Sequence, residues 1–141
     1  MKVVLDTNVF VSAIFWKGSP HEILKLAENE HVVLAVSQET LNELFGVLAR
    51  KKFDRYFQEA KIDRKKVSEH ILSLVELFSP KQKVSIITED PSDNQFLACA
   101  LAARTSFVIS GDRHLLRIKE FHNIPIVTPK QFLIGIKKKK A

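Results

Sequence analysis

Residues 1–13 read MKVVLDTNVFVSA, and the order of apolar and polar residues in this stretch indicates how the chain folds. Residues 2–5 are typical of a short buried strand, and residues 9–15 have the apolar spacing of a helix. A carboxylate, Asp6, follows the strand directly. Because the end of a central parallel strand is normally among the driest places in a fold, an acid at this position indicates a functional site.

Strand-like and helix-like segments alternate along the rest of the chain. Short runs rich in β-branched residues indicate strands, and apolar residues at helical spacing indicate the helices between them. Further strands are expected at residues 31–36, 83–88, 106–110 and 125–127, and further helices at residues 20–27, from the cap Ser37 to residue 48, and at 62–78, 91–104, 113–118 and 129–136. This order predicts an α/β fold with a central, mainly parallel sheet of about five strands that helices cover on both faces.

Length and composition fit one folded domain. The chain has 141 residues and 45% apolar content, so a single domain is expected over residues 1–136, and the lysine-rich residues 137–141 are expected to form a disordered basic tail. The sequence shows neither a long apolar span nor a leader pattern, and a cytoplasmic protein without a membrane segment is therefore expected. The net charge of +6 favours a polyanionic partner, although solvated helix faces would also explain much of it.

Four acids are expected at one edge of the sheet. In a parallel sheet with right-handed crossovers, every joint from a strand to a helix lies along the same edge. Asp6 and Asp112 follow strands, Asp93 lies in the first turn of the helix after the third strand, and Glu43 lies two turns into the helix after the second. Considered one at a time, Asp112 would serve as a helix cap, and so would Asp90, which lies three residues before Asp93. Asp93 would be stabilised by the dipole of the helix whose first turn it occupies.

A divalent cation would make such a cluster stable. Carboxylates that converge in a partly buried site repel one another and take up protons unless a cation is present. A donor set made only of oxygen suits Mg²⁺ or Mn²⁺, and one or two such ions support hydrolysis of a phosphodiester by water. The predicted metal ligands and catalytic residues are Asp6, Glu43, Asp93 and Asp112.

Three polar residues lie beside these acids in the sequence. Thr7 and Asn8 follow Asp6 and would orient its carboxylate, hold a substrate phosphate or simply cap a helix. Ser110 precedes Asp112 by two residues, and its hydroxyl would reach the same edge. These residues are therefore candidates for supporting roles at the site.

Four blocks of the sequence, taken together, resemble a PIN domain of the type found in VapC-like toxins and their prokaryotic relatives. The blocks are VVLDTNVFVSA, SQETLNELFGVLARKKF, EDPSDNQFLACALAA, and FVISGDRHLL followed by IPIVTP, and the resemblance runs from residue 2 to about residue 132. It implies a Rossmann-like α/β/α sandwich and a metal-dependent endoribonuclease that acts on RNA. It also implies a homodimer and, for the toxins of toxin-antitoxin pairs, an antitoxin protein as partner.

The resemblance also assigns residues. The four family acids correspond to Asp6, Glu43, Asp93 and Asp112, and Ser110 occupies the polar position before the last of them. Asp90, which lies near the third acid, is expected to support it from a second layer of contacts.

Two other functions are compatible with parts of the sequence. A phosphatase of the haloacid dehalogenase type also has an Asp after the first strand, but it needs a second Asp two residues later, where this chain has Asn8. An RNA-binding or assembly module with an inactive PIN-like site would instead act through the basic segments around Arg50 and Arg64. Its binding would fall with salt and be indifferent to a chelator.

Overall fold

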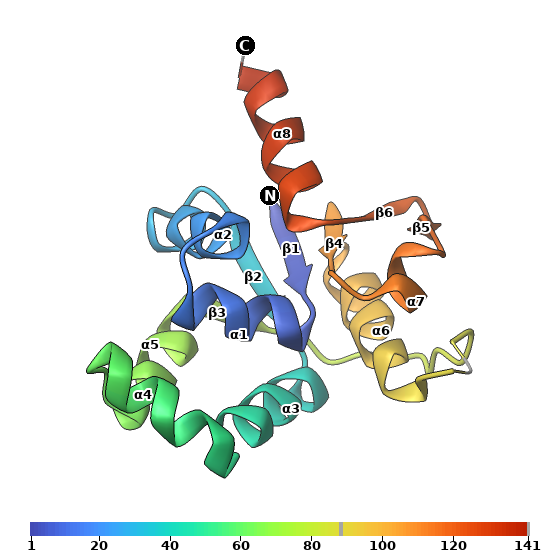
Figure 1. Ribbon diagram of the computed structural model, residues 1–141. Helices are drawn as coiled ribbons and strands as arrows, with labels where there is room; N and C mark the ends of the chain where they lie inside the picture. Colours follow the sequence, from blue (N-terminus) through green and yellow to red (C-terminus); the bar gives the residue numbers. More distant parts are fainter. Residues whose placement is uncertain (88, 141) are drawn as a thin grey trace.

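The strands and helices of the chain are seen in a computed structural model that describes residues 1–87 and 89–140 (Figure 1). The strands are β1 (Lys2–Leu5), β2 (Val33–Val36), β3 (Val75–Leu77), β4 (Phe107–Ile109), β5 (Glu120–Phe121) and β6 (Ile124–Val127). The helices are α1 (Thr7–Phe15), α2 (Ser19–Glu28), α3 (Gln38–Leu48), α4 (Asp54–Ala60), α5 (Arg64–Leu74), α6 (Asn94–Ala103), α7 (Arg113–Leu116) and α8 (Pro129–Lys140), with short 3-10 turns η1 (Lys51–Phe53) and η2 (Pro91–Asp93).

The strands form one sheet whose order is β3-β2-β1-β4-β6-β5 over the described residues. All neighbouring strands are parallel except β5 and β6, which are antiparallel. The predicted α/β class with a mainly parallel sheet is confirmed, but the sequence predicted neither β5 nor the position of β3. Since β1, β2 and β4 are parallel, their carboxyl ends lie at one edge of the sheet.

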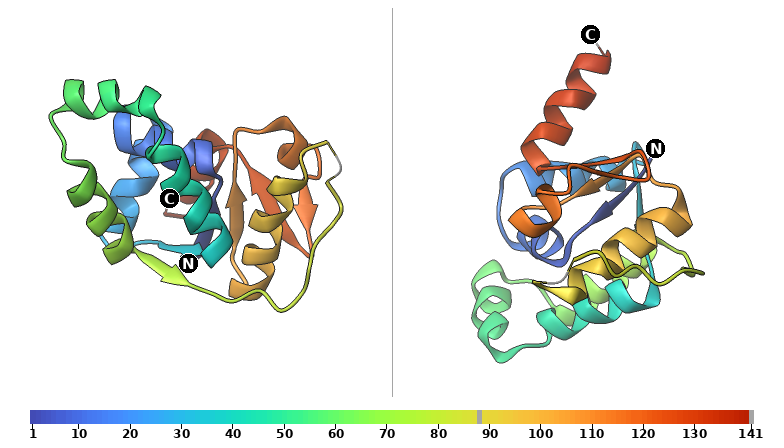
Figure 2. Two further views of the ribbon diagram at one scale, coloured as in Figure 1. Left: turned by 90° about the horizontal axis from the view of Figure 1, so that it is seen from below. Right: turned by 90° about the vertical axis from the view of Figure 1, so that its right-hand side faces the viewer.

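Figure 2 shows helices on both faces of the sheet. Alternate residues of β1 face the two layers. Val3 and Leu5 belong to a buried cluster that includes side chains of α1, α2, α3 and α8. Val4 faces the opposite side and packs in a second cluster, which is built mainly by α6, β4 and β6. This is the α/β/α sandwich that the resemblance implied, and it places the edge at the end of β1 between two helical layers.

The start of α3 is set by the predicted cap, Ser37. The Ser37 hydroxyl accepts a hydrogen bond from the backbone N–H of Thr40 at 3.2 Å, and the Thr40 hydroxyl accepts one from the backbone N–H of Ser37 at 2.9 Å. This reciprocal arrangement satisfies two donors at the start of the helix. It fixes where α3 leaves β2 and therefore where the next turn of α3, which carries Glu43, meets the edge of the sheet.

Two predictions for residues 62–88 are wrong. Helix α5 ends at Leu74, and residues 75–77 form β3 instead of the last turn of a helix that was expected to reach residue 78. β3 pairs with β2, whose free edge offers backbone hydrogen bonds that outweigh the helical spacing of the sequence. The strand expected at residues 83–88 is not formed at 83–87, and residue 88 lies outside the described residues.

The last described residues also differ from the prediction. Helix α8 was expected to end at residue 136, but it continues to Lys140, so residues 137–140 are helical and not a disordered tail. Lysine has a high helix propensity, and its charge is favourable near a helix C-terminus. None of the helices in the described part of the chain has the length and apolar character that crossing a membrane requires.

Candidate metal-binding site at the carboxyl edge of the sheet

Asp6 lies where β1 ends and is held by four contacts. Only 4% of the residue is exposed. Its Oδ1 accepts a hydrogen bond from the backbone N–H of Val9 at 2.8 Å and so caps α1, and its Oδ2 accepts one from the Ser110 hydroxyl. Its backbone N–H donates to the carbonyl of Ile109 at 3.0 Å, and its carbonyl accepts from the N–H of Phe10 at 3.0 Å. The Asp6 carboxylate is therefore fixed between the ends of β1 and β4.

Ser110 connects Asp6 to the next acid, Asp112. The Ser110 side chain is fully buried, and its oxygen also accepts a hydrogen bond from the backbone N–H of Asp112 at 2.9 Å. Asp112 Oδ1 accepts from the N–H of His114 at 2.8 Å and caps α7. The expectation that Ser110 reaches this edge is confirmed, and so is the cap position of Asp112. Asp112 also shares a side-chain hydrogen bond with Asp93.

Asp93 and Asp90 come from η2 and approach Asp112. One carboxylate oxygen from each of the three lies within 4.8 Å of the others. Asp93 is 7% exposed, and its Oδ2 is buried without a hydrogen-bond partner among the described residues. Asp90 is half-buried and accepts a hydrogen bond from the Ser92 hydroxyl at 2.5 Å. Asp90 therefore belongs to the cluster itself, whereas the resemblance placed it behind Asp93.

Glu43 reaches the edge through Thr7. The Thr7 hydroxyl donates a hydrogen bond to Glu43 Oε2 and so joins α3 to the first residue of α1, directly after Asp6. Glu43 is half-buried, while Thr7 is buried. Asn8 is exposed on the first turn of α1. The structure thus places Thr7 and Ser110 against the predicted acids and leaves Asn8 on the surface beside them.

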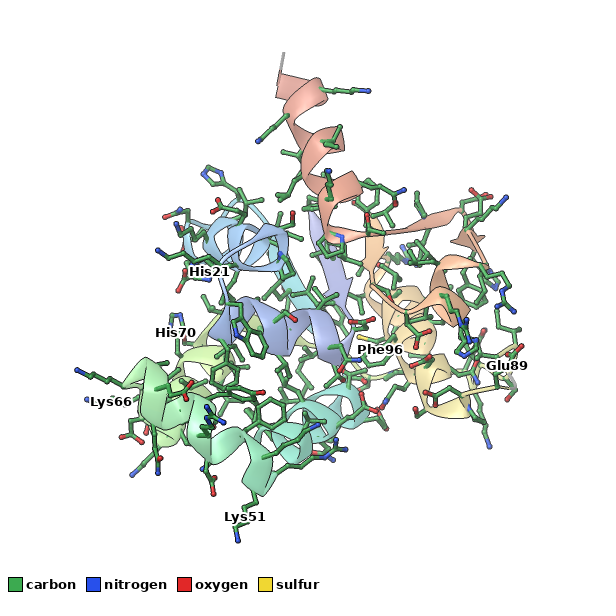
Figure 3. All side chains as sticks on the ribbon, viewed as in Figure 1. His21, Lys51, Lys66, His70, Glu89 and Phe96 are labelled. Atoms are coloured by element: carbon green, nitrogen blue, oxygen red, sulfur yellow. The ribbon has the colours of Figure 1, made fainter. Side chains whose placement is uncertain are left out.

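Segments far apart in the sequence meet at this edge. Phe96, which follows Asp93 by three residues, lies on α6 (Figure 3). Phe96 is buried and forms part of the apolar cluster on the α6 side of the sheet.

The electrostatics of the cluster favour protonation when no cation is bound. Burial raises the pKa of Asp93 to about 8, together with a hydrogen bond that protonated Asp93 donates to Asp112 and the negative charge of Asp112. The charges of Asp90 and Asp6 act in the same direction. Burial also raises the pKa of Asp6, although hydrogen bonds from Ser110, Val9 and Gly111 oppose this shift. Holding Asp90, Asp93 and Asp112 close together as ionised carboxylates therefore costs free energy, and a cation between them would remove this repulsion.

The donor set fits a hard divalent cation. The group of possible ligands consists of carboxylates alone, which suits Mg²⁺ or Mn²⁺ better than a softer metal. The buried Oδ2 of Asp93 is a polar atom that needs a partner, and a cation between the acids would provide one. The residues present therefore fit the ion that the sequence predicted.

Asn94 is a supporting residue that the sequence did not reveal. Its amide oxygen accepts a hydrogen bond from the N–H of Ile87 at 2.9 Å, and its amide nitrogen donates to the carbonyls of Ile87 at 2.9 Å and Pro91 at 3.0 Å. Asn94 is 7% exposed. The Asn94 side chain therefore satisfies backbone groups of the irregular segment before η2, which would otherwise be satisfied by strand pairing. It thereby fixes the positions of Asp90 and Asp93.

Replacing Asn94 with Ala is expected to lower the free energy of unfolding by about 2 kcal/mol, because buried backbone groups of Ile87 and Pro91 lose their partner. Urea unfolding followed by circular dichroism measures the change. The matched control is Asn42→Ala, on the exposed side of α3, which should change stability by less than about 0.5 kcal/mol. Equal stability of the two variants would contradict this role.

Comparisons with known proteins agree with the fold. The model of the family described as "PIN domain" matches residues 2–114. The chain is 28% identical over 143 aligned positions to the uncharacterized protein MJ1680 of Methanocaldococcus jannaschii, and the alignment covers 94% of this chain and 90% of the relative.

Two solved structures share the fold at low sequence identity. VapBC2 from Rickettsia felis, solved bound to a DNA fragment from their promoter, aligns with a TM-score of 0.59 and 21% identity over 89% of this chain and 97% of that chain. PAE2754 from Pyrobaculum aerophilum aligns with a TM-score of 0.58 and 15% identity over 97% of this chain and 89% of that chain.

Proposed function

The chain belongs to the PIN domain family, and from this premise we propose that it is a divalent-metal-dependent endoribonuclease that hydrolyses phosphodiester bonds of RNA. The observation that carries the proposal is the convergence of Asp6, Asp90, Asp93 and Asp112 at one edge of the sheet, with the buried Oδ2 of Asp93 unpartnered among the described residues. Buried carboxylates this close together repel one another unless a cation lies between them, and an oxygen-only cation site of this kind supports hydrolysis of a phosphodiester.

Each acid has a distinct part in the proposed reaction. Asp93, Asp112 and Asp90 would hold Mg²⁺ or Mn²⁺ together with Asp6, whose orientation is fixed by Ser110 and Val9. When bound, the ion would activate a water molecule as nucleophile and stabilise the charge that develops on the leaving oxygen. Asp93, which keeps its proton at neutral pH in the absence of a cation, would release that proton as the site fills.

Glu43 and Thr7 complete the proposed site on the α1 side. The hydrogen bond from Thr7 holds the Glu43 carboxylate beside Asp6, where it would contact the ion or water on it. Asn8, on the exposed rim, would contact the phosphate of the substrate. We infer these roles from position, since Glu43 is hydrogen-bonded to Thr7, the residue after Asp6, and Asn8 follows Thr7 in the first turn of α1.

The biological role that we infer is that of the toxin in a toxin-antitoxin pair, acting in the cytoplasm with RNA as substrate. An antitoxin protein and a second copy of the chain are the proposed partners. The fold similarity to VapBC2 supports this role, because that assembly contains a protein of the same architecture. The basic character of the chain, with a net charge of +6, supports RNA as the substrate.

The direct test uses labelled total RNA incubated with the protein and Mg²⁺, Mn²⁺ or EDTA. We expect cleavage with either metal and none in EDTA, because the acids repel one another without a cation. A parallel assay with p-nitrophenyl phosphate is expected to show no turnover. Turnover of this ester without cutting of RNA would favour a phosphatase, and binding of RNA that is indifferent to EDTA and never followed by cutting would favour an inactive binding module.

Removing the Ser110 hydroxyl is expected to lower the rate of cleavage about 10- to 100-fold, the usual effect of losing a residue that orients a metal ligand. In Ser110→Ala, the Asp6 carboxylate loses the hydrogen bond from Ser110 and keeps those from the N–H groups of Val9 and Gly111, and the N–H of Asp112 loses its acceptor. Initial rates at saturating RNA measure the effect. The control is Ser106→Ala, at an exposed position before β4, and similar rates for both variants would contradict the role of Ser110.

A further inference from the structure

Two hollows adjoin on the outer side of α6. The first has a volume of about 400 Å³, and its lining includes Ala98 and Leu101 of α6. The second has a volume of about 470 Å³ and extends to Pro91 and Asn94, the residues that flank Asp93. The hollows share Lys81, Gln82 and Ala98 as lining residues. We refer to the two together as the α6 groove, and one of its ends lies beside the cluster of acids.

The α6 groove lies between the helix and the segment that follows β3. Both views in Figure 2 show this segment passing α6 on the outside of the molecule before the chain returns to the start of the helix. The segment contributes Lys81 and Lys83, and the opposite end of α6 contributes Arg104. Cationic side chains therefore line the groove from the end of α6 back toward the acids.

The charges in the groove are strongly unbalanced. The lining contains Lys81, Lys83 and Arg104, whereas Glu39 is its one carboxylate among the described residues. All three cationic residues are exposed, and none of the ion pairs between described residues involves them. A groove with this balance attracts a polyanion and has no internal partner for its positive charge.

The floor of the groove is apolar and made of small side chains. Ala98 and Ala102 lie along it, with Leu101 between them. Small residues leave room for a flat group to rest on the helix surface, and cations at the rim can hold the phosphates that join such groups. A positively charged groove that follows the phosphate backbone is one part of the pattern by which proteins bind a single strand of nucleic acid.

The length of the groove matches a short segment of such a strand. Asn94 and Arg104 are ten residues apart in α6 and its cap, which corresponds to about 15 Å at 1.5 Å per residue. A stacked single strand with a spacing of about 3.4 Å would place about four nucleotides along this length.

We propose that the α6 groove binds the single-stranded RNA that flanks the bond to be cut, with Lys81, Lys83 and Arg104 on its phosphates. The proposal rests on the proposed function for the identity of the polyanion. It assigns substrate-binding residues that lie outside the cluster of acids, and it predicts that substrates long enough to enter the groove bind more tightly than shorter ones.

The test compares the wild type with the double variant Lys81→Gln/Arg104→Asn. Arg104 has a φ of 53°, and Asn is chosen there because it tolerates this left-handed conformation. The matched control is Lys65→Gln/Lys66→Gln, which removes the same charge from exposed positions of α5. Lys66 lies on the side of the molecule opposite α6 (Figure 3). Circular dichroism melts confirm that both variants are folded.

The first readout is binding of a labelled pool of randomised 12-nucleotide RNA in EDTA, at several KCl concentrations. Each phosphate contact on a single strand contributes about 0.7 to the slope of log K against log salt, so the double variant should lose about 1.4 from that slope. We also expect its affinity at low salt to fall about tenfold, while the control variant stays close to wild type. Equal slopes for the two variants would overturn the proposal.

The second readout is cleavage of the 12-nucleotide pool and of a randomised trinucleotide pool. The double variant should have a higher KM for the longer RNA and an unchanged kcat, with unchanged rates on the trinucleotides, which end before the groove. Equal losses on both pools would overturn the proposal. If wild type cuts neither pool with Mg²⁺ or Mn²⁺, the proposed function fails, while the binding readout still decides whether the groove holds RNA.

Sedimentation velocity tests the alternative that the α6 groove binds a second copy of the chain instead of RNA. The wild type and the double variant should have the same oligomeric state. If the double variant dissociates an oligomer of the wild type, the α6 groove is an interface between copies of the chain, and the assignment to RNA is wrong.

Discussion

Replacing Asp93 or Asp6 with Asn is expected to reduce RNA cleavage at least about 100-fold and to leave the fold intact. Each substitution removes a negative charge from the cluster of acids, and a loss of about 2.7 kcal/mol in transition-state stabilisation is enough for this effect. Asp93 has no partner for Oδ2 among the described residues, so the exchange sacrifices no hydrogen bond of that atom. Asn in place of Asp6 can still cap α1, because Asn and Asp are comparable N-caps.

The measurement is the initial rate on labelled total RNA in Mg²⁺ and in Mn²⁺, with circular dichroism to confirm folding. Asp63→Asn is the control, since Asp63 is an exposed cap of α5 and the substitution removes the same charge away from the acids. This control should cut at the wild-type rate. Should the Asp93 and Asp6 variants cut as fast as the control, the assignment of the catalytic site is wrong.

The topology explains why the main acids could be located from the sequence. Asp6 and Asp112 follow parallel strands that neighbour each other, β1 and β4, and the edge at which such strands end is the same for both. Their approach depends on the sheet alone and not on details of loop structure. The interaction of Ser110 with both acids follows from the same register, which places Ser110 directly after the last residue of β4.

The segment before Asp93 could not be predicted in the same way. Residues 83–87 have the composition of a strand, but β3 is already formed by residues 75–77, and the chain then passes α6 without joining the sheet. Asn94 holds this segment by hydrogen bonds to Ile87, seven residues earlier, and the periodicity of apolar residues does not encode this contact. The position of Asp90 within the cluster depends on this irregular backbone, which is why the sequence placed it farther away.

A helix was also missed between α3 and α5. Residues 50–60 are rich in charged side chains and were not among the expected helices, but they include η1 and α4. The available signal was the pair Phe53 and Phe57, four residues apart and both buried against Phe15. Two aromatic side chains at this spacing share one face of a helix, and their burial is sufficient to order a short segment.

The metal-free protein is expected to lose stability as the pH rises from about 4 to about 8, and a large part of the loss should come from Asp93. In the unfolded chain an Asp releases its proton near its usual pKa of about 3.9, whereas in the folded protein the pKa of Asp93 is about 8. Between these values the folded state binds more protons than the unfolded state, so the free energy of unfolding falls with increasing pH. The stabilising contribution of Asp93 is complete below its pKa in the unfolded chain, about 3.9, and is lost as the pH rises past about 8.

Thermal unfolding in EDTA between pH 5 and pH 8.5 measures this effect. The useful quantity is the difference between the wild type and Asp93→Asn, because the histidines contribute equally to both. We expect the variant to have the flatter dependence and the higher Tm at pH 8, since it keeps the side chain in the neutral form. Asp63→Asn should follow the wild type, and parallel curves for the wild type and Asp93→Asn would show that Asp93 titrates normally.

Adding Mg²⁺ or Mn²⁺ should reverse the loss in the wild type and have little effect on Asp93→Asn. A ligand present at a hundred times its Kd stabilises the folded state by about 2.7 kcal/mol, which corresponds to a rise in Tm of roughly 5–10 °C for a chain of this size. The rise should be larger at pH 8 than at pH 5.5, because protons compete with the cation for the carboxylates at the lower pH. The same charges that destabilise the metal-free site thus determine its affinity for the cation, and a pH-independent rise in Tm would mean that the ion binds elsewhere.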